Sequence, residues 1–382
     1  MGFSLYVHIP YCQSKCPYCD FNSHAAVTWP EEAYVGALTA ELRARLAELP
    51  WTAGGISTIF FGGGTPSLFE PESIERIIEC ANHIRPVESG AEVTLEANPG
   101  TVTLAKFAGY RAAGVNRISM GAQSFDAASL RFLGRIHGAD DTREAARLAH
   151  RAGFSRLNLD LIFALPGQTP AAAIADIDAA AELGPDHISA YNLTFEEGTA
   201  FFSEMRRGRI IPMPSDDQAE IFQAVRESLA RRGYPMYEIS NYAPAGHESR
   251  HNLTYWHGES YLGIGAGAHS FARDGVVGRR WWNERAPGRY IEIATASGRA
   301  ETGAETTDGE TAAGEFVFLN LRLRAGFRIN DFDRRFVVGF DSLYGERAAR
   351  LIEDGLLERD DGNIRLTERG LELADSVFAE FV

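Results

Sequence analysis

Short apolar runs alternate with longer amphipathic segments along the first half of the chain. Six apolar runs read as buried strands, at residues 5–9, 58–61, 92–96, 117–120, 158–163 and 187–193. Segments with helical periodicity lie between them, at residues 31–46, 71–84, 103–113, 142–152 and 170–183. Strand, helix and strand repeated in this way predict an α/β fold with a parallel sheet. Right-handed crossovers would curl the six units into a partial (β/α)6 barrel.

The pattern changes near residue 300. Residues 301–314 are acidic and rich in Gly, Thr and Ala, which predicts a linker. Beyond it the sequence predicts helices at 315–324, 329–336 and 342–354, a hairpin formed by 356–359 and 363–366, and a last helix capped by Thr367. This order resembles a winged-helix module. We therefore expect three regions: a barrel at 1–200, an extension at 201–300 and a C-terminal winged-helix-like domain at 301–382.

Three of the four cysteines lie together on the loop after the first predicted strand. Cys12, Cys16 and Cys19 have the spacing C-x3-C-x2-C, which can hold three irons of a [4Fe–4S] cube and leave the fourth iron without a protein ligand. A zinc site completed by His8 or His24 would usually need a second Cys-x2–4-Cys pair, and the chain has none. Disulfides or free thiols are the remaining alternative, but a chain of 382 residues does not depend on cross-links for its core.

Polar and glycine-rich groups follow the other predicted strands. Gly62, Gly63, Gly64 and Thr65 follow the second strand, where a backbone without side chains lets a ligand approach closely. Taken alone, this run also fits a plain tight turn. It lacks the Lys-Ser/Thr ending of a phosphate-binding loop, so it does not imply ATP.

Glu96, Gln123 and Asp160 stand at the ends of the next three predicted strands. A single acidic residue at a strand end usually caps a helix or is solvated. Three polar residues in register with the barrel repeat instead favour a binding site at the mouth of the barrel, where the strand ends meet.

Together these motifs resemble a known family. The cysteine spacing is similar to the signature of radical S-adenosylmethionine (radical SAM) proteins, in which SAM binds the open iron and is cleaved to a 5′-deoxyadenosyl radical. Within that family, the chain resembles the oxygen-independent coproporphyrinogen III oxidase group over residues 3–270, and more weakly beyond. The matching runs are Tyr6-Val7-His8-Ile9-Pro10-Tyr11-Cys12, Gly62-Gly63-Gly64-Thr65-Pro66, Glu96-Ala97-Asn98-Pro99, Arg117-Ile118-Ser119-Met120-Gly121-Ala122-Gln123-Ser124-Phe125 and Asn158-Leu159-Asp160-Leu161.

The resemblance implies a role for each of these residues. It places the cluster on the three cysteines and the methionine end of SAM at the glycine run. It implies further SAM contacts by Glu96, Gln123 and Asp160. Tyr11 and Phe21 would shield the cluster or face the adenine.

One departure separates the chain from the oxidases of the group. Those enzymes usually continue the loop as Cys-x3-Cys-x2-Cys-x-Cys, whereas Phe21 stands at the position of the fourth cysteine. The chain also begins only a few residues before its first strand, without the longer N-terminal segment of the oxidases. Both features are similar to the branch of the group that serves as haem chaperones.

A second motif points to the same branch. His251-Asn252-Leu253-Thr254-Tyr255-Trp256 matches the H-N-x-x-Y-W run that the chaperones are proposed to use in haem binding. Imidazole and phenolate both bind haem iron, and Trp256 can stack on a porphyrin. By residue type alone His251 also fits a packed structural histidine, with His247, His257 and His269 as competing ligands. The resemblance implies His251 and Tyr255 as haem contacts.

Charge and hydropathy restrict the partners. The formal net charge is −15, from 37 Lys+Arg and 52 Asp+Glu, which disfavours nucleic acid. The basic run at 206–209 fits a solvated loop. No apolar stretch is long enough for a membrane span, and the N-terminus shows no targeting segment, so we expect a cytoplasmic protein. Peripheral membrane contact and a cluster-dependent dimer stay open.

The sequence therefore predicts a radical SAM haem chaperone with a [4Fe–4S] cluster, SAM and haem, which passes haem to acceptor proteins. The alternative is coproporphyrinogen III dehydrogenase, in which the radical abstracts a propionate hydrogen and carbon dioxide leaves. A third hypothesis is another radical reaction on a tetrapyrrole, such as ring-opening methylation. Phe21 and the run at 251–256 favour the chaperone, and whether the protein also has a catalytic activity is left open.

Overall fold

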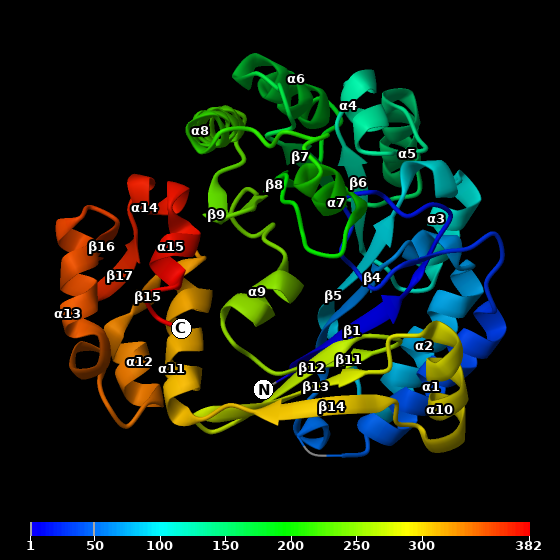
Figure 1. Ribbon diagram of the computed structural model, residues 1–382. Helices are drawn as coiled ribbons and strands as arrows, with labels where there is room; N and C mark the ends of the chain where they lie inside the picture. The colour runs from blue at the N-terminus through cyan, green and yellow to red at the C-terminus, as the bar shows by residue number, and fades with distance from the viewer. Residues whose placement is uncertain (1, 49) are drawn as a thin grey trace.

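The computed structural model describes residues 2–48 and 50–382. A twelve-stranded sheet forms its centre, in the order β14-β13-β12-β11-β1-β4-β5-β6-β7-β8-β10-β9 (Figure 1). The six predicted strands are neighbours in this sheet and pair in parallel. They are β1 (Phe3–Ile9), β4 (Ile56–Gly63), β5 (Val87–Ala97), β6 (Arg117–Gln123), β7 (Arg156–Phe163) and β8 (His187–Asn192). The predicted α/β class with a parallel core is confirmed.

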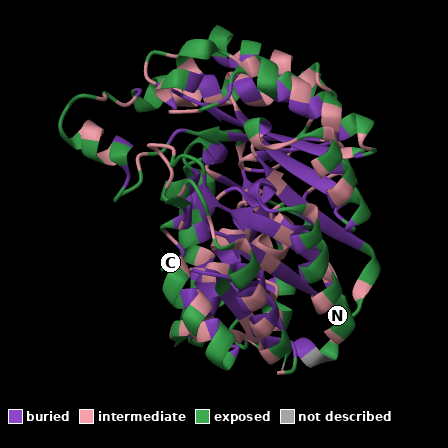
Figure 2. Ribbon diagram, turned by 90° about the vertical axis from the view of Figure 1, so that its right-hand side faces the viewer, coloured by how far each residue is buried: buried purple, intermediate pink, exposed green. Residues whose placement is uncertain are grey.

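Helices cover the outer face of the parallel strands. The predicted helices are α1 (Glu31–Arg45), α2 (Pro71–Ile84), α3 (Leu104–Ala112), α5 (Ala139–Arg151) and α6 (Pro170–Ala181), and the short α4 (Ala127–Phe132) precedes α5. In Figure 2 the strands lie in the buried interior and the helices expose their outer sides. Parallel strands covered on both faces need continuous apolar runs, which is why the sequence located them well.

Residues after β8 extend the same sheet at both edges. β9 (Met236–Glu238) and β10 (Asn241–Tyr242) continue it beyond β8. At the other edge β11 (Tyr261–Ile264) pairs in parallel with β1, and antiparallel strands β12 (His269–Asp274), β13 (Val277–Asn283) and β14 (Glu301–Thr306) follow. The helices of this part are α7 (Ala200–Arg206), α8 (Ser215–Arg231), α9 (Arg250–Trp256) and α10 (Pro287–Ser297).

The predicted linker at 301–314 is wrong. Its first half is the edge strand β14, and its second half begins α11 (Gly309–Leu321). The strand is largely exposed and polar, as edge strands often are, so it lacks the apolar signal of a strand. The sequence did not predict the start of this helix, because small residues form the face that packs against the rest of the domain. A side chain at Gly314 would lie 2.2 Å from the backbone oxygen of Phe381.

The C-terminal residues form a second hydrophobic core. Phe316, Phe332, Phe336 and Phe340 are buried in it. The elements after α11 are β15 (Phe327–Arg328), α12 (Ile329–Arg335), α13 (Phe340–Glu353), β16 (Leu357–Asp360), β17 (Asn363–Leu366), α14 (Glu368–Glu372) and α15 (Ala374–Phe378). Their order, with the sheet β15-β17-β16, is that of the predicted winged-helix module. Thr367 caps α14, as predicted, by accepting the Gly370 amide.

No helix in the described part of the chain combines the length and the apolar character that a membrane crossing requires.

A buried carboxylate joins the first helix to the sheet extension. Glu41 of α1 is fully buried and accepts hydrogen bonds from the Gly265 amide at 3.0 Å, Asn283 Nδ2 at 2.7 Å and the Tyr290 hydroxyl at 2.7 Å. Gly265 has a φ of +104°, and a Cβ there would lie 2.4 Å from the His8 carbonyl oxygen. The close approach of β11 to β1 therefore requires a glycine, and Glu41 holds its amide.

We expect Glu41→Leu to lower the free energy of unfolding by about 3 kcal/mol, because it leaves the Gly265 amide and the Tyr290 hydroxyl unpaired in the core. Glu32→Leu is the matched control on the same helix, since Glu32 is exposed and forms a surface ion pair with Arg76. Urea unfolding of the three proteins measures the difference. Equal losses in the two variants would show that the Glu41 contacts contribute no more than a surface pair.

Candidate functional site

Parallel register brings the predicted binding residues to one end of the sheet. Ile9 pairs with Gly63, and Gly121 pairs with Asp160. Glu96 Oε2 accepts the Gly63 amide at 3.1 Å, so the glycine run and the first acid are in direct contact. Gly63 has a φ of +112°, and a Cβ there would lie 2.4 Å from the ring of His8, so this position requires a glycine.

Asp160 lies beside Glu96 without a cationic partner in hydrogen-bond contact among the described residues. Its carboxylate accepts Asn158 Nδ2 at 2.7 Å and the Ser119 hydroxyl at 3.3 Å. Gln123 ends the neighbouring strand β6 in the left-handed region, with a φ of 67°. Such a conformation is unusual outside glycine and marks a constrained strand end.

Burial raises the pKa of Glu96 to about 8, and repulsion from Asp160 adds to the shift. Burial also raises the pKa of Asp160. Two adjacent carboxyl groups with raised pKa values can share a proton or attract a cation. The chemistry of the pair therefore suits a ligand that carries an amino group.

The cysteine loop lies against the glycine run. Cys12 belongs to the short strand β2 (Tyr11–Cys12), which pairs with β3 (His24–Ala25), and Cys16 and Cys19 lie on the loop between them. The Thr65 hydroxyl donates to Cys12 Sγ at 3.5 Å, and Cys19 Sγ lies 3.7 Å from the Ser23 hydroxyl. Burial raises the pKa of the Cys12 and Cys19 thiols.

The donor set fits an iron–sulfur cluster better than a single ion. Within residues 2–48 and 50–382, no three His, Cys, Asp or Glu side chains converge on one ion position. A cubane does not need such convergence, because each thiolate binds a different iron. The three sulfurs belong to residues 12–19 and have hydroxyl or guanidinium donors beside them, which suits a group with a net negative charge.

Arg135 is a site residue that sequence reasoning missed. It lies between α4 and α5, donates to Cys16 Sγ at 3.3 Å and to the Gly121 carbonyl at 3.0 Å, and has no ion-pair partner in the described residues. A guanidinium in this position can hold a carboxylate between the cysteine loop and β6. Arg135 lies outside every motif and periodic segment that the sequence analysis used, and only its position between Gly134 and Gly138 could have indicated a turn there.

A cavity of about 360 Å³ opens beside the glycine run. Of the predicted residues, it brings together Gly63, Glu96, Phe21 and Tyr255. Sequence reasoning assigned no role in this cavity to the other lining residues. His8 was named only as a possible zinc ligand, His269 only as a competing haem ligand, and Tyr6 only within a matching run. The remaining lining residues are Asn22, Tyr261, Gly267, Ala268 and Arg285. Tyr255 thus links the strand-end site to the H-N-x-x-Y-W run. Gln123, Asp160 and the three cysteines do not line this cavity.

Two expectations for aromatic residues change. Tyr11 packs in the core with its ring 5.4 Å from Tyr34, and it does not line the cavity that Phe21 lines. Trp256 has one ring face covered by the Arg322 guanidinium at 4.3 Å. A porphyrin could therefore not stack on that face without displacing Arg322.

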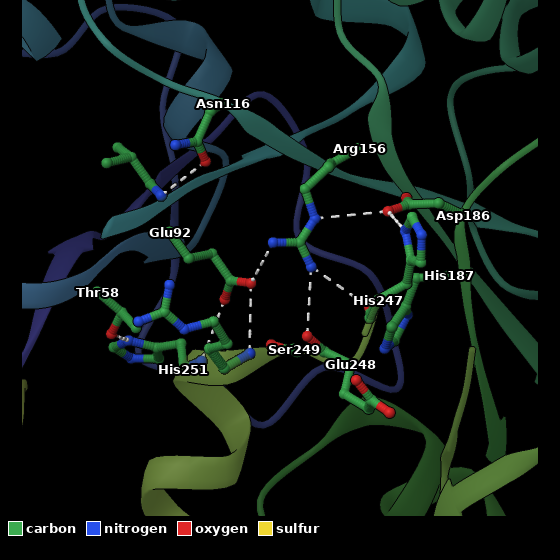
Figure 3. A network of polar contacts seen from close by, with 12 residues as sticks. Thr58, Glu92, Asn116, Arg156, Asp186, His187, His247, Glu248, Ser249 and His251 are labelled. Carbon is green, nitrogen blue, oxygen red and sulfur yellow. Dashed lines mark hydrogen bonds and ion pairs between the residues drawn. The ribbon is translucent and has the colours of Figure 1, made fainter. Parts of the chain in front are cut away.

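A buried network holds the helix that carries the motif (Figure 3). Glu92 of β5 accepts the Arg250 and His251 amides at 3.3 and 3.1 Å and forms an ion pair with Arg156 at 3.1 Å. Arg156 in turn pairs with Asp186 and donates to the carbonyls of residues 247 and 248. One carboxylate thus fixes the start of α9 on the parallel sheet, with two backbone amides directed at it.

His251 is the last member of a directional hydrogen-bond chain. The Thr254 hydroxyl donates its proton to the Arg250 carbonyl. The Thr254 hydroxyl oxygen therefore accepts a hydrogen bond from the Ser4 hydroxyl at 2.8 Å. The Thr58 hydroxyl donates to Ser4 at 2.8 Å, so it accepts from His251 Nδ1 at 2.7 Å. The proton of the neutral imidazole is therefore on Nδ1.

The other imidazole nitrogen then carries the lone pair. His251 Nε2 accepts from the Tyr255 hydroxyl at 2.8 Å, and burial lowers the pKa of His251 to about 3. A neutral imidazole with a fixed Nδ1–H partner is the form in which histidine binds metals. The Tyr255 hydroxyl occupies the nitrogen that would bind, and the Tyr255 ring separates it from the cavity.

The competing histidines have other surroundings. His247 Nδ1 lies 2.8 Å from Asp186, and His257 is exposed at the end of α9. His269 lines the cavity and stacks on Trp282 with ring centres 5.8 Å apart.

Comparison with known proteins supports one family. Residues 6–180 match the radical SAM superfamily, and residues 308–373 match the HemN C-terminal domain. The chain is 34% identical to the protein named heme chaperone HemW of Bacillus subtilis over 380 residues, covering 99% of both. It is 44% identical to that of Escherichia coli over 298 residues, covering 76% of this chain and 77% of the relative.

The fold is similar to that of a solved enzyme. The structure of coproporphyrinogen III oxidase HemN from Escherichia coli, described as a radical SAM enzyme, superposes with a TM-score of 0.84 and 25% identity. The match covers 100% of this chain and 90% of that one. Both branches of the group are thus represented among the similar proteins.

We expect Glu92→Gln to loosen α9, because the start of the helix loses a carboxylate and Arg156 loses a charged partner. Amide exchange of residues 250–256, followed by mass spectrometry, should become at least about tenfold faster. Glu88→Gln is the control, since Glu88 is exposed on the same strand. Unchanged protection of α9 in the Glu92 variant would contradict the anchoring role.

Glu96 should make stability pH-dependent. Its carboxyl pKa is about 8 in the folded protein and near 4.5 in the unfolded chain, so the unfolded chain ionises first as the pH rises. The wild type should therefore lose stability relative to Glu96→Gln between pH 5 and 8, by on the order of 3 kcal/mol. Urea unfolding without SAM measures this. Parallel pH curves for the two proteins would show that Glu96 ionises normally.

Proposed function

Because the chain belongs to the HemW family of radical SAM proteins, we propose that it is a haem chaperone, which holds haem and passes it to haem-requiring acceptor proteins. The observation that carries this proposal is the state of His251. Its imidazole is neutral, its proton is fixed on Nδ1 by Thr58, and a single hydroxyl covers Nε2. Such an imidazole becomes a ligand for haem iron when that hydroxyl moves away.

Haem is the cargo in this proposal, and Tyr255 controls access to its ligand. The Tyr255 side chain lines the cavity of about 360 Å³ and hydrogen-bonds His251 behind it. Binding through His251 requires the hydroxyl of Tyr255 to leave Nε2, while the bond from Nδ1 to Thr58 stays. The hydrogen bond that is lost in this exchange makes loading reversible, which suits a protein that must also release haem.

Cys12, Cys16 and Cys19 would hold the [4Fe–4S] cluster, and the glycine run at 62–65 would lie at the methionine end of SAM. A cluster of this type, when bound, supplies an electron for cleavage of SAM. Glu96 and Asp160 would bind the amino group of SAM, because within residues 2–48 and 50–382 they accept hydrogen bonds but neither forms an ion pair. Arg135 would hold its carboxylate. Gln123, at the end of β6, would be a further SAM contact.

The alternative function is oxidation of coproporphyrinogen III, since the solved oxidase has the same fold. Phe21 is 61% exposed and lines the cavity at the end of the cysteine loop. An aromatic side chain there provides an apolar surface where the oxidases carry a cysteine. This favours a chaperone, in which no decarboxylation of the porphyrin need occur.

The wider setting follows from the same proposal. We place the protein in the cytoplasm, with haem-acceptor proteins as its partners and no nucleic acid. Its three regions would be the barrel with the cluster and SAM at 1–200, the motif-bearing extension at 201–300 and the C-terminal domain at 301–382. Peripheral membrane contact and a dimer that forms with the cluster are compatible with this arrangement.

Haem titration of two variants tests the role of His251. After anaerobic reconstitution with iron and sulfide, the wild type should bind haem with a histidine-ligated absorption spectrum, and His251→Ala should lose that spectrum. Tyr255→Phe should keep the spectrum and bind haem at least as tightly, because no hydroxyl competes for Nε2. Loss of the spectrum in Tyr255→Phe with retention in His251→Ala would identify the phenol as the ligand.

The same reconstituted wild type, given coproporphyrinogen III, SAM and a reductant, should leave the porphyrinogen unconsumed. Decarboxylated product together with weak haem uptake would overturn the chaperone proposal in favour of the oxidase.

A further inference from the structure

A second cavity lies on the other side of the Tyr255 ring. It encloses about 120 Å³ between the strands β11 to β13 and the helices α11 and α12 of the C-terminal domain. Tyr255 and Tyr261 line this cavity as well as the first one, and their rings meet edge to face at 4.7 Å. These two rings form the partition between the SAM-side cavity and the C-terminal domain.

The walls of this second cavity are aromatic and apolar with a few charged groups. Phe271 and Phe316 face it from the sheet and from α11. The acidic groups around it are already engaged. Arg280 donates to Glu315 at 2.7 and 2.6 Å and pairs with Glu305, and Arg273 pairs with Glu259 at 3.0 Å.

Arg335 is the exception among these charges. It is the last residue of α12, lines the cavity and has neither an ion pair nor a hydrogen bond within the described residues. Its Nε is buried without an acceptor. The guanidinium lies over the rings of Phe316 and Phe336, at 5.4 Å from each centre.

Arg335 is half-buried, but a buried Nε without an acceptor is costly, so its retention calls for a partner. Burial and the neighbouring Arg273 lower the pKa of Arg335 to about 10, which leaves it a cation at neutral pH. Planar guanidinium groups bind carboxylates with two parallel hydrogen bonds. The missing partner is therefore an anion, and the apolar surroundings favour one attached to an apolar body.

We propose that Arg335 binds a carboxylate that enters the second cavity, and, resting on the function proposed above, that this carboxylate is a propionate of haem. The cavity is well below the roughly 300–1,000 Å³ that whole drug-sized ligands occupy, so it admits a side arm and not the macrocycle. Its partition includes Tyr255, the residue that covers the His251 nitrogen. In this proposal one haem molecule extends across both cavities. Its propionate enters the second cavity, and its iron lies on the side of the first cavity.

The test compares haem with haem dimethyl ester, which has the same iron and macrocycle but no free carboxylates. Both are titrated into the reconstituted full chain, as the wild type and as Arg335→Met, Arg335→Lys and Arg334→Gln. The Met variant keeps an apolar stem over the phenylalanine rings, and the Lys variant keeps the charge. Arg334 is the control, because its side chain is 78% exposed on the same helix and pairs with Asp331. Thermal unfolding verifies that each variant is folded.

The wild type should bind haem at least about tenfold more tightly than the ester, as expected for a charge-assisted pair. Arg335→Met should bind both at the affinity of the ester, with the histidine-ligated spectrum unchanged. Arg335→Lys should restore part of the preference, and Arg334→Gln should behave as the wild type.

Two results would overturn the assignment. One is equal binding of haem and ester by the wild type, and the other is an unchanged preference in Arg335→Met. Either leaves the chaperone function intact, because haem still binds. A wild type that binds neither compound would instead refute the proposed function itself.

Discussion

Parallel pairing in register is the constraint on which the site depends. Six neighbouring strands run in the same direction, so their carboxyl ends lie together at one end of the sheet. Residues far apart in the sequence are thereby brought into contact, as the bond from the Gly63 amide to Glu96 shows. The cysteine loop follows the first of these strands and meets the glycine run through Thr65. A register shift of one residue would separate all of these groups.

The same sheet also positions the motif-bearing helix. Glu92 and Thr58 belong to the central strands, and they hold the start of α9 and the imidazole of His251. The helix therefore lies at a fixed distance from the strand-end site although it belongs to a later part of the chain. Tyr255 then faces both cavities, and Arg335 reaches the second cavity from the C-terminal domain. We interpret the cysteine loop, the two cavities and the end of α12 as parts of one continuous binding site.

The parts of this arrangement that depend on short-range patterns could be predicted from the sequence. Buried parallel strands are continuous apolar runs, and all six were recognised. The cysteine spacing and the glycine run are also local. The edge strand β14 was missed because its residues are polar. The start of α11 was missed because its buried face consists of the small residues Ala312, Ala313 and Gly314, which give no apolar helical periodicity.

Contacts between distant segments could not be predicted. The tautomer of His251 follows from Ser4 and Thr58, and even Thr58 lies 193 residues before His251 in the sequence. Arg135 belongs to no recognisable sequence motif. That Arg335 lacks an ion-pair partner in the described residues becomes clear only from the structure, in which the neighbouring acidic side chains pair with other arginines. The family resemblance identified His251 and Tyr255, but not the hydrogen bond by which one covers the other.

The structure of the protein with haem bound would test the central claim most directly. Our account predicts that iron binds His251 Nε2, that Nδ1 keeps its hydrogen bond to Thr58, and that the Tyr255 hydroxyl has turned away from the imidazole. Iron bound to another residue, with the hydrogen bond between His251 and Tyr255 intact, would contradict it.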